Sequence, residues 1–258
     1  MSSLFTHMPA SLHLILLFAA GIWAGMQNSL AGGGSFITLP TLILTGMTPL
    51  AANITSTVAL FPGQVTSGFA GRSLVSGAKG LSFKALFGLS LIGGILGGLL
   101  LLNTPSSIFA RLVPWLVLFA TTVFTWGSFF RKENDNNGFH LGMTGAAIAQ
   151  LLISIYGGYF GGGIGFLMMA ALTMAGLSTR NAGATKNALA GVMNASAVAL
   201  FIFSKDLHWL QAIILGAGAI LGGLLGAWAL HRVNEKILRI VIICIGIALT
   251  IGLFLRPV

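Results

Sequence analysis

Apolar runs of membrane-spanning length recur along this chain and constrain its fold more than any other feature. A helix needs about 20 apolar residues to cross the hydrocarbon core of a bilayer. Runs near that length cover Leu12–Leu30, Ala51–Ala70, Phe83–Leu102, Ile108–Phe130, Leu141–Phe160, Ala188–Phe203, Ala212–Leu230 and Ile237–Leu255. Backbone groups in hydrocarbon need partners within the chain, so continuous apolar runs predict helices and exclude alternating barrel strands. The sequence therefore predicts an all-α integral membrane protein embedded in a lipid bilayer.

The charged residues fit the same class of protein. The net charge is +9, but the basic residues are spread over the short connectors and do not cluster on one soluble face, so we expect no nucleic acid partner. The histidines have no zinc-site spacing, and no Ser/His/acid set can be assembled within the bundle. We expect no enzyme activity, no catalytic residues, no metal and no cofactor. The single cysteine, Cys244, lies among isoleucines and is expected to be a buried thiol.

An internal duplication gives the architecture. The segment "ILGGLL" occurs at 95–100 and again at 220–225, and glycine triplets occur at 32–34 and 161–163. The segment "LTGMTPLAANITSTVALFPGQ" matches "MAGLSTRNAGATKNALAGVMN", which aligns Gln64 with Asn194. We predict a single transmembrane domain over 1–258, with repeat one at about 10–130, a polar linker at 131–138 and repeat two at about 139–256.

The two repeats are expected to be inverted relative to each other. The apolar piece Ser35–Thr45 gives roughly 16 Å of helix, too short to cross about 30 Å of hydrocarbon. If it returns the chain to the side from which the preceding helix entered, most basic connectors share one face, as the positive-inside rule prefers. Each repeat is then a broken or re-entrant helical hairpin followed by three transmembrane helices. Both termini are predicted to be non-cytoplasmic.

The polar residues in the predicted membrane interior are almost all neutral. All four acidic residues fall in connectors, which argues against a cation transporter. The interior polar candidates for substrate binding are Asn28, Ser35, Asn53, Thr55, Thr57, Gln64, Thr185, Asn187 and Asn194. Hydrogen bonding between helices is the alternative role for these side chains. Lys186 is the one basic residue that could reach the interior, either as a counter-charge for a substrate or as a lysine that snorkels to the interface.

The glycine triplets are the strongest candidates for a functional site. Each glycine costs about 0.8–1 kcal/mol against alanine in a helix interior, so three in a row indicate a place where a helix stops. The helices that follow, at 35–45 and 164–175, would begin with free N–H groups and a positive dipole end, which bind anions. The triplet residues Gly32, Gly33, Gly34, Gly161, Gly162 and Gly163 are therefore added to the predicted substrate site. A tight hairpin turn that binds nothing is the alternative.

At these residues the chain resembles the TauE/SafE family, also called the sulfite exporter or toluene-sulfonate uptake permease group. The resemblance covers nearly the whole chain and rests on "AGGGSFITLP" with "TPLAANITST", and on "YGGYFGGGIGFLMMAALTMAGLSTRNAGATKNALAGVMN". It implies a bacterial inner-membrane permease for sulfite, sulfonates or related carboxylates. The positions that match the family motifs are Gly32, Gly33, Gly34, Asn53, Thr55, Gly161, Gly162, Gly163, Thr185 and Asn187.

These observations together predict a secondary transporter for small anions that works by alternating access around a central site. An anion channel or uncoupled facilitator is the first alternative, and a membrane scaffold subunit is the second. The small-residue faces are compatible with packing within one chain or within a homo-oligomer.

Overall fold

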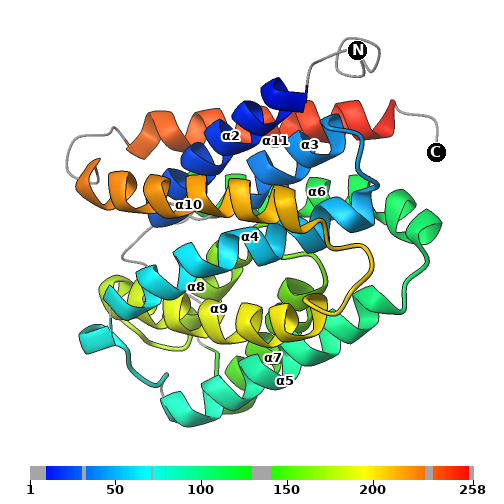
Figure 1. Ribbon diagram of the computed structural model, residues 1–258. Coiled ribbons are helices and arrows are strands. Elements are labelled where there is room, and N and C mark those ends of the chain that lie inside the picture. Colours follow the sequence, from blue (N-terminus) through cyan, green and yellow to red (C-terminus); the bar gives the residue numbers. More distant parts are fainter. Residues whose placement is uncertain are drawn as a thin grey trace.

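The described part of the chain is helical, as the apolar runs predict. The computed structural model describes residues 10–30, 33–70, 72–78, 80–129, 141–229 and 235–255. Within these ranges it contains ten α-helices, one short 3-10 helix, η1 (Arg72–Leu74), and no β-strand (Figure 1). The α-helices are α2 (Ala10–Leu30), α3 (Ser35–Leu44), α4 (Pro49–Ala70), α5 (Phe83–Leu102), α6 (Ser106–Phe129), α7 (Met143–Tyr159), α8 (Ile164–Met174), α9 (Thr179–Phe201), α10 (Trp209–Ala229) and α11 (Glu235–Phe254).

Three helices of the described part of the chain are both long and apolar enough to span a membrane by length and composition alone. These are α5, α6 and α10, while parts of α2, α3, α8 and α11 form shorter apolar helices. Helix α9 begins at Thr179, before the apolar run 188–203, and includes the polar stretch that precedes this run. Thr185 in this stretch is buried and bonds to the backbone of Ser76, a partner that lipid would not supply.

The two halves of the chain place a short helix at the same point in their order. Helix α3 follows α2 and precedes α4, and α8 follows α7 and precedes α9. The turns after the two short helices also match: Gly46 N bonds to Ile43 O and Met47 N to Leu42 O, while Gly176 N bonds to Thr173 O and Leu177 N to Leu172 O. Gly46 and Gly176 both adopt left-handed backbone conformations, with φ of 96° and 93°.

Glycines bring two pairs of parallel helices into close contact. Helix α2 packs along α10, and α7 packs along α5. A Cβ added at Gly222 would overlap the carbonyl oxygen of Ile22 in α2, and one added at Gly97 would overlap that of Ile155 in α7. The small-residue spacing of the two "ILGGLL" segments predicts such close contacts, and the structure confirms this role for these glycines.

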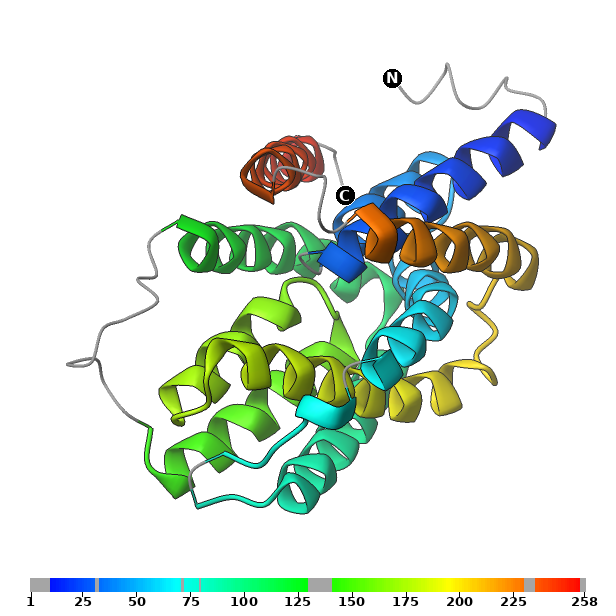
Figure 2. The same cartoon turned by 90° about the vertical axis from the view of Figure 1, so that its left-hand side faces the viewer.

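Helices α4 and α9 lie in the middle of the bundle and contact each other. Figure 1 shows α10 and α2 on one side of this central pair and α5 and α7 on the other. In Figure 2 the red helix α11 is seen end-on at the edge of the bundle, beside the green α6. Cys244 of α11 is exposed in the isolated chain, so the expectation of a buried thiol is wrong. Its apolar setting suits contact with lipid, which sequence alone does not distinguish from contact with protein.

The α2–α10 contact predicts a large difference between two identical substitutions. Gly222→Ala places a methyl group against the backbone of α2 and should lower the free energy of unfolding by about 1–3 kcal/mol. Gly88→Ala in α5 has no atom within 4 Å of the added Cβ, so it should leave stability unchanged or raise it by about 0.5–1 kcal/mol. Unfolding of both variants in detergent, followed by circular dichroism, measures the difference. Equal effects would contradict the predicted role of the contact.

Candidate functional site

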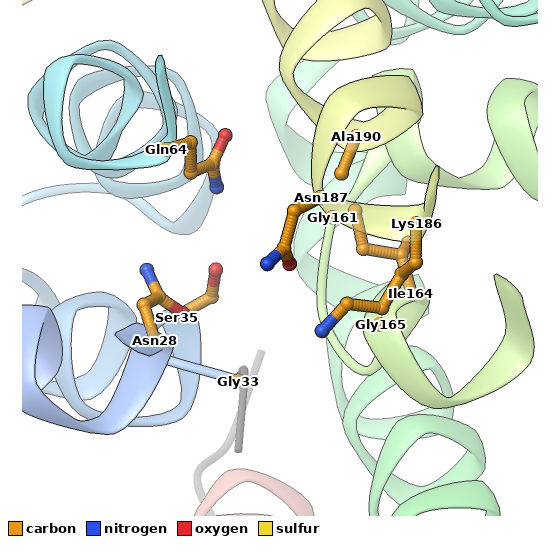
Figure 3. Close-up of a pocket in the computed structure, with 10 residues that line it drawn as sticks. All are labelled: Asn28, Gly33, Ser35, Gln64, Gly161, Ile164, Gly165, Lys186, Asn187 and Ala190. Carbon is orange, nitrogen blue, oxygen red and sulfur yellow. The ribbon is translucent and has the colours of Figure 1, made fainter. Parts of the chain in front are cut away.

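A pocket lies between the two halves of the chain, at the starts of both short helices. Gly33, Ser35, Asn28 and Gln64 line it from the first half. The second half contributes Gly161, Ile164, Gly165, Lys186, Asn187 and Ala190. In Figure 3 the side chains of Asn28, Ser35 and Gln64 face those of Lys186 and Asn187 across an open space. The cavity has a volume of about 50 Å³, several times the roughly 10–15 Å³ that one water molecule needs on the same measure.

The two short helices begin at this pocket with similar backbone geometry. Gly33 and Gly163 both have positive φ, 85° and 73°, and their carbonyl oxygens accept the bonds from Phe36 N and Phe166 N. Positive φ matches Gly33 with Gly163. The residues that cap the two helices, Gly34 and Gly163, match instead in the alignment of the triplets 32–34 and 161–163. Each of these two carbonyl oxygens accepts bonds from the residues three and four positions later, so the register of the triplets stays a prediction.

Hydrogen bonds to protein neighbours orient two amides of the pocket. Gly34 N donates to Asn28 Oδ1 at 2.7 Å, and Asn194 Nδ2 donates to Gln64 Oε1. Because each oxygen is already engaged, the NH₂ group of each amide is the part left to face the pocket. Figure 3 shows the nitrogen of Gln64 on the side that faces Asn28 and Ser35. The pocket therefore presents hydrogen-bond donors.

Lys186 supplies the positive charge of the pocket. Its side chain points into the space in Figure 3, next to Asn187. Nζ lies beside Gly165, 3.7 Å from the position that a Cβ on that glycine would occupy. No carboxylate lines the pocket, and Lys186 makes no ion pair with a residue of the described part of the chain. A half-buried cation without a counter-ion is unfavourable, so this arrangement favours an anionic ligand.

Three of the predicted site residues lie outside the pocket lining and hold protein segments together. Thr185 Oγ1 accepts a bond from Ser76 N at 3.0 Å and donates to Ser76 O at 3.2 Å. Thr55 Oγ1 accepts from His208 N at 3.2 Å. Asn53 Nδ2 donates to Tyr159 O at 3.0 Å. Each of these bonds joins one half of the chain to the other.

The remaining predicted residues are also outside the lining. Thr57 Oγ1 bonds to Asn53 O within α4, Asn194 contacts the pocket only through Gln64, and Gly34 uses its N–H on Asn28. Gly162 and Gly163 are buried beside Phe160 and Ala120. Gly32 lies outside the described residues.

Sequence reasoning missed Ile164, Gly165 and Ala190 as pocket residues. Ile164 and Gly165 are the first two residues of α8, directly after the second glycine triplet, and this position is the signal that could have found them. Ala190 lies one helical turn beyond Asn187, on the same face of α9.

An aromatic cluster joins the starts of the two short helices. The ring of Phe124 in α6 lies 6.0 Å from that of Phe36 and 4.2 Å from that of Phe166, both edge-on. Phe36 and Phe166 are the two residues whose N–H groups bond to Gly33 O and Gly163 O. Edge-on pairs of this kind stabilise by about 0.5–1.5 kcal/mol beyond their buried area. Phe124 therefore fixes both helix starts beside the pocket.

Comparison with known proteins gives the same class of molecule. The family model "Sulfite exporter TauE/SafE" matches residues 17–253. The chain is 26% identical to a "Probable membrane transporter protein" of Haemophilus influenzae, with 92% of each chain covered. It is 28% identical to "Probable membrane transporter protein ORF9" of Sinorhizobium sp, covering 95% of this chain and 93% of that protein. It is 27% identical to "Probable membrane transporter protein YfcA" of Escherichia coli K12, covering 93% and 88%. No solved structure matches the chain significantly.

The contact between Thr185 and Ser76 predicts a loss of stability when the hydroxyl is removed. Thr185→Val keeps the shape of this fully buried side chain but leaves both backbone groups of Ser76 without their partner. The free energy of unfolding should fall by about 1 kcal/mol, the scale of hydrogen bonds between membrane helices. Thr185→Ser keeps the hydroxyl and is the matched control. If the two variants unfold alike in detergent, the bond contributes nothing to stability.

Proposed function

Because the chain belongs to the sulfite exporter TauE/SafE family, we propose that it is a secondary transporter that carries a small anion through the pocket between its two halves. Family membership and the transporter names of its relatives identify it as a multi-pass membrane transporter. The proposal adds the charge of the substrate, the place where it binds and the way in which it crosses. Sulfite, sulfonates and small carboxylates are the substrates that the family's name and chemistry suggest.

The donor-lined pocket is the observation that carries this proposal. One lysine, two oriented amides, a serine hydroxyl and the starts of two helices converge on a space with no carboxylate. The helix starts attract anions through their dipoles, and the lysine adds a full charge. The N–H groups of Gly34, Phe36 and Ile37 are already bonded within the protein, so the expectation of free N–H groups at the start of α3 is wrong for these three. A cation would meet no carboxylate among the residues that line the pocket.

The contacts between helices support two inverted repeats, at about 10–130 and 139–256. If α2–α6 correspond to α7–α11 in order, then the α2–α10 contact corresponds to α7–α5, and α4–α10 to α9–α5. The correspondence exchanges α4 with α9, so the central contact between these two helices maps onto the same contact. Its bond between Gln64 and Asn194 joins two residues that the sequence alignment makes equivalent. Such self-matching contacts are expected beside a pseudo-twofold axis, where transporters of this design bind substrate.

We propose that the two hairpins, α2–α3 and α7–α8, move with α4 and α9 against the outer helices. Movement of these helices against the outer ones would expose the same pocket to each side of the membrane in turn. This alternating access distinguishes a carrier from an open channel.

The distribution of basic residues supports an orientation in the membrane. Arg72 and Lys84 lie at the end where α5 begins, and the Thr185–Ser76 bonds place the start of α9, with Arg180, at this same end. The positive-inside rule makes this end cytoplasmic. Helix α10 begins after Lys205 at the opposite end of the bundle, and α2 runs parallel to it, so α2 also begins at that end. Phe254, at the end of α11, contacts Trp115 in the first half of α6. Because α6 begins at the opposite end as well, α11 ends there. Both termini are therefore proposed to be non-cytoplasmic, in a bacterial inner membrane.

Filling the pocket should stop transport without breaking the fold. An added Cβ at Gly165 makes only ordinary contacts with Lys186, at 3.7–3.8 Å, so Gly165→Leu extends into the cavity. Uptake of radiolabelled sulfite into proteoliposomes should fall by about tenfold or more, because the substrate loses its space and its approach to Lys186. Gly191→Leu, on α9 with no atom within 4 Å of its Cβ, is the matched control and should transport normally. Uptake that Gly165→Leu leaves unchanged would exclude this pocket as the route.

A counterflow measurement separates the carrier from the channel. Unlabelled sulfite inside the vesicles should accelerate entry of labelled sulfite through a carrier, because loaded sites return faster than empty ones. Entry that does not respond to internal sulfite, together with single-channel currents, would contradict alternating access.

The proposed orientation predicts which cysteines are accessible from outside the cell. In a Cys244→Ser background, an impermeant maleimide should label Lys205→Cys in intact cells, because Lys205 lies exposed in the connector after α9. Arg72→Cys, at the opposite end of the bundle, should be labelled only after the cells are permeabilised. Labelling of Arg72→Cys in intact cells, with Lys205→Cys protected, would invert the orientation.

A further inference from the structure

We propose that the pocket selects a compact oxyanion with a single negative charge, and that Lys186 is the residue that sets this charge. The inference rests on the proposed transport function and deepens it by naming the substrate class. Its basis is an asymmetry between the two halves of the pocket: one half provides a cation and the other half provides only neutral donors.

The position in the first half that corresponds to Lys186 has no charge. The matched turns at Gly46 and Gly176 pair residues 130 apart, so Lys186 corresponds to Ser56. Ser56 is buried and shares a hydrogen bond with Thr38, and it does not line the pocket. A twofold repetition of the site would give two lysines, but this chain supplies one. The asymmetry is a property of these residues and does not follow from the repeated architecture.

Among the residues that line the pocket, Lys186 is the one with a charged side chain. The helices α3, α4 and α8 contain no ionisable side chain, and the ionisable residue of α2, His13, lies about four turns before Asn28. Arg180, on the same helix as Lys186, lies between one and two turns before it and is exposed. Lys84 and Arg72, on the neighbouring α5 and η1, are exposed at the end of the bundle. The ring of Phe69 lies 4.2 Å from the Arg72 guanidinium and engages it there.

The remaining groups suit the oxygens of a small anion. Asn28 and Gln64 present NH₂ groups because their oxygens are bonded to Gly34 N and Asn194. Ser35 and Asn187 also line the pocket, and each can donate a hydrogen bond. Several donors at different angles favour an ion with several oxygen atoms over a spherical halide. The cavity of about 50 Å³ has room for a small ion.

The number of negative charges then decides binding. A monoanion beside Lys186 leaves the pocket electrically neutral, whereas a dianion leaves one negative charge that only neutral donors and helix starts can stabilise. An uncompensated charge in a poorly hydrated site is strongly unfavourable. A monoanion should therefore be preferred over a dianion of the same size and shape.

Methanesulfonate and sulfate test this inference, because they have similar sulfur–oxygen heads and keep one and two negative charges through the neutral pH range. Uptake is measured in proteoliposomes with the membrane potential held at zero, so that the potential favours neither ion. The wild-type protein should take up methanesulfonate at least about tenfold faster than sulfate, the scale of one hydrogen bond to a charged group.

Variants assign the selectivity to Lys186. Lys186→Met should reduce methanesulfonate uptake by about tenfold or more, and Lys186→Arg, which keeps the charge, should retain most of it. Ser35→Lys adds a second charge on the opposite wall and should raise the ratio of sulfate to methanesulfonate uptake. Lys205→Met, in a connector far from the pocket, is the control and should match the wild type. Thermal unfolding of each purified variant identifies any that fails to fold.

The outcomes separate this inference from the proposed function. Equal uptake of the two ions by the wild type, or an unchanged ratio in folded Lys186→Met, overturns the charge selectivity while transport through the pocket stands. If Lys186→Met does not fold, the wild-type ratio and the Ser35→Lys ratio still decide. Uptake of neither ion, together with sulfite uptake that is insensitive to Gly165→Leu, overturns both.

Discussion

The absence of water between packed membrane helices is the constraint on which this structure depends. Polar groups inside such a bundle must be paired by the protein itself. Thr55, Thr185 and Asn53 meet this demand by bonding to backbone groups of the other half of the chain. These bonds hold the central helices α4 and α9 in place. They also explain why polar residues that look functional in the sequence are not at the pocket.

At the pocket, the pairing of polar groups within the protein is incomplete. The side-chain oxygens of Asn28 and Gln64 accept hydrogen bonds from the protein, and their NH₂ groups remain available to a ligand. Lys186 has no described partner of opposite charge. Hydrogen bonds to the protein hold the amides of Asn28 and Gln64 in place, and their NH₂ groups together with Lys186 favour a ligand that accepts hydrogen bonds.

Close helix packing and the pocket are two results of the same glycine-rich composition. Glycines such as Gly97 and Gly222 lie inside helices and let backbones touch, whereas Gly33 and Gly163 end a turn with positive φ. The repeated spacing of the first group in "ILGGLL" is a direct sequence signal for packing. The second group stands in runs, and a run does not reveal which member takes the left-handed conformation. This is why the sequence did not show that the cap of α3, Gly34, is right-handed while the cap of α8, Gly163, is left-handed.

The sequence by itself determined the membrane environment, the helical class, the order of long and short helices, and the family motifs, because each depends on local composition or spacing. It also identified five residues that line the pocket: Asn28, Ser35, Gln64, Lys186 and Asn187. Only the tertiary structure decided which polar residues pair with protein and which face the open space. That division depends on contacts such as Gln64 with Asn194 and Thr185 with Ser76, between residues more than 100 positions apart. Local sequence carries no record of which of two buried hydroxyls or amides will find a partner across such a distance.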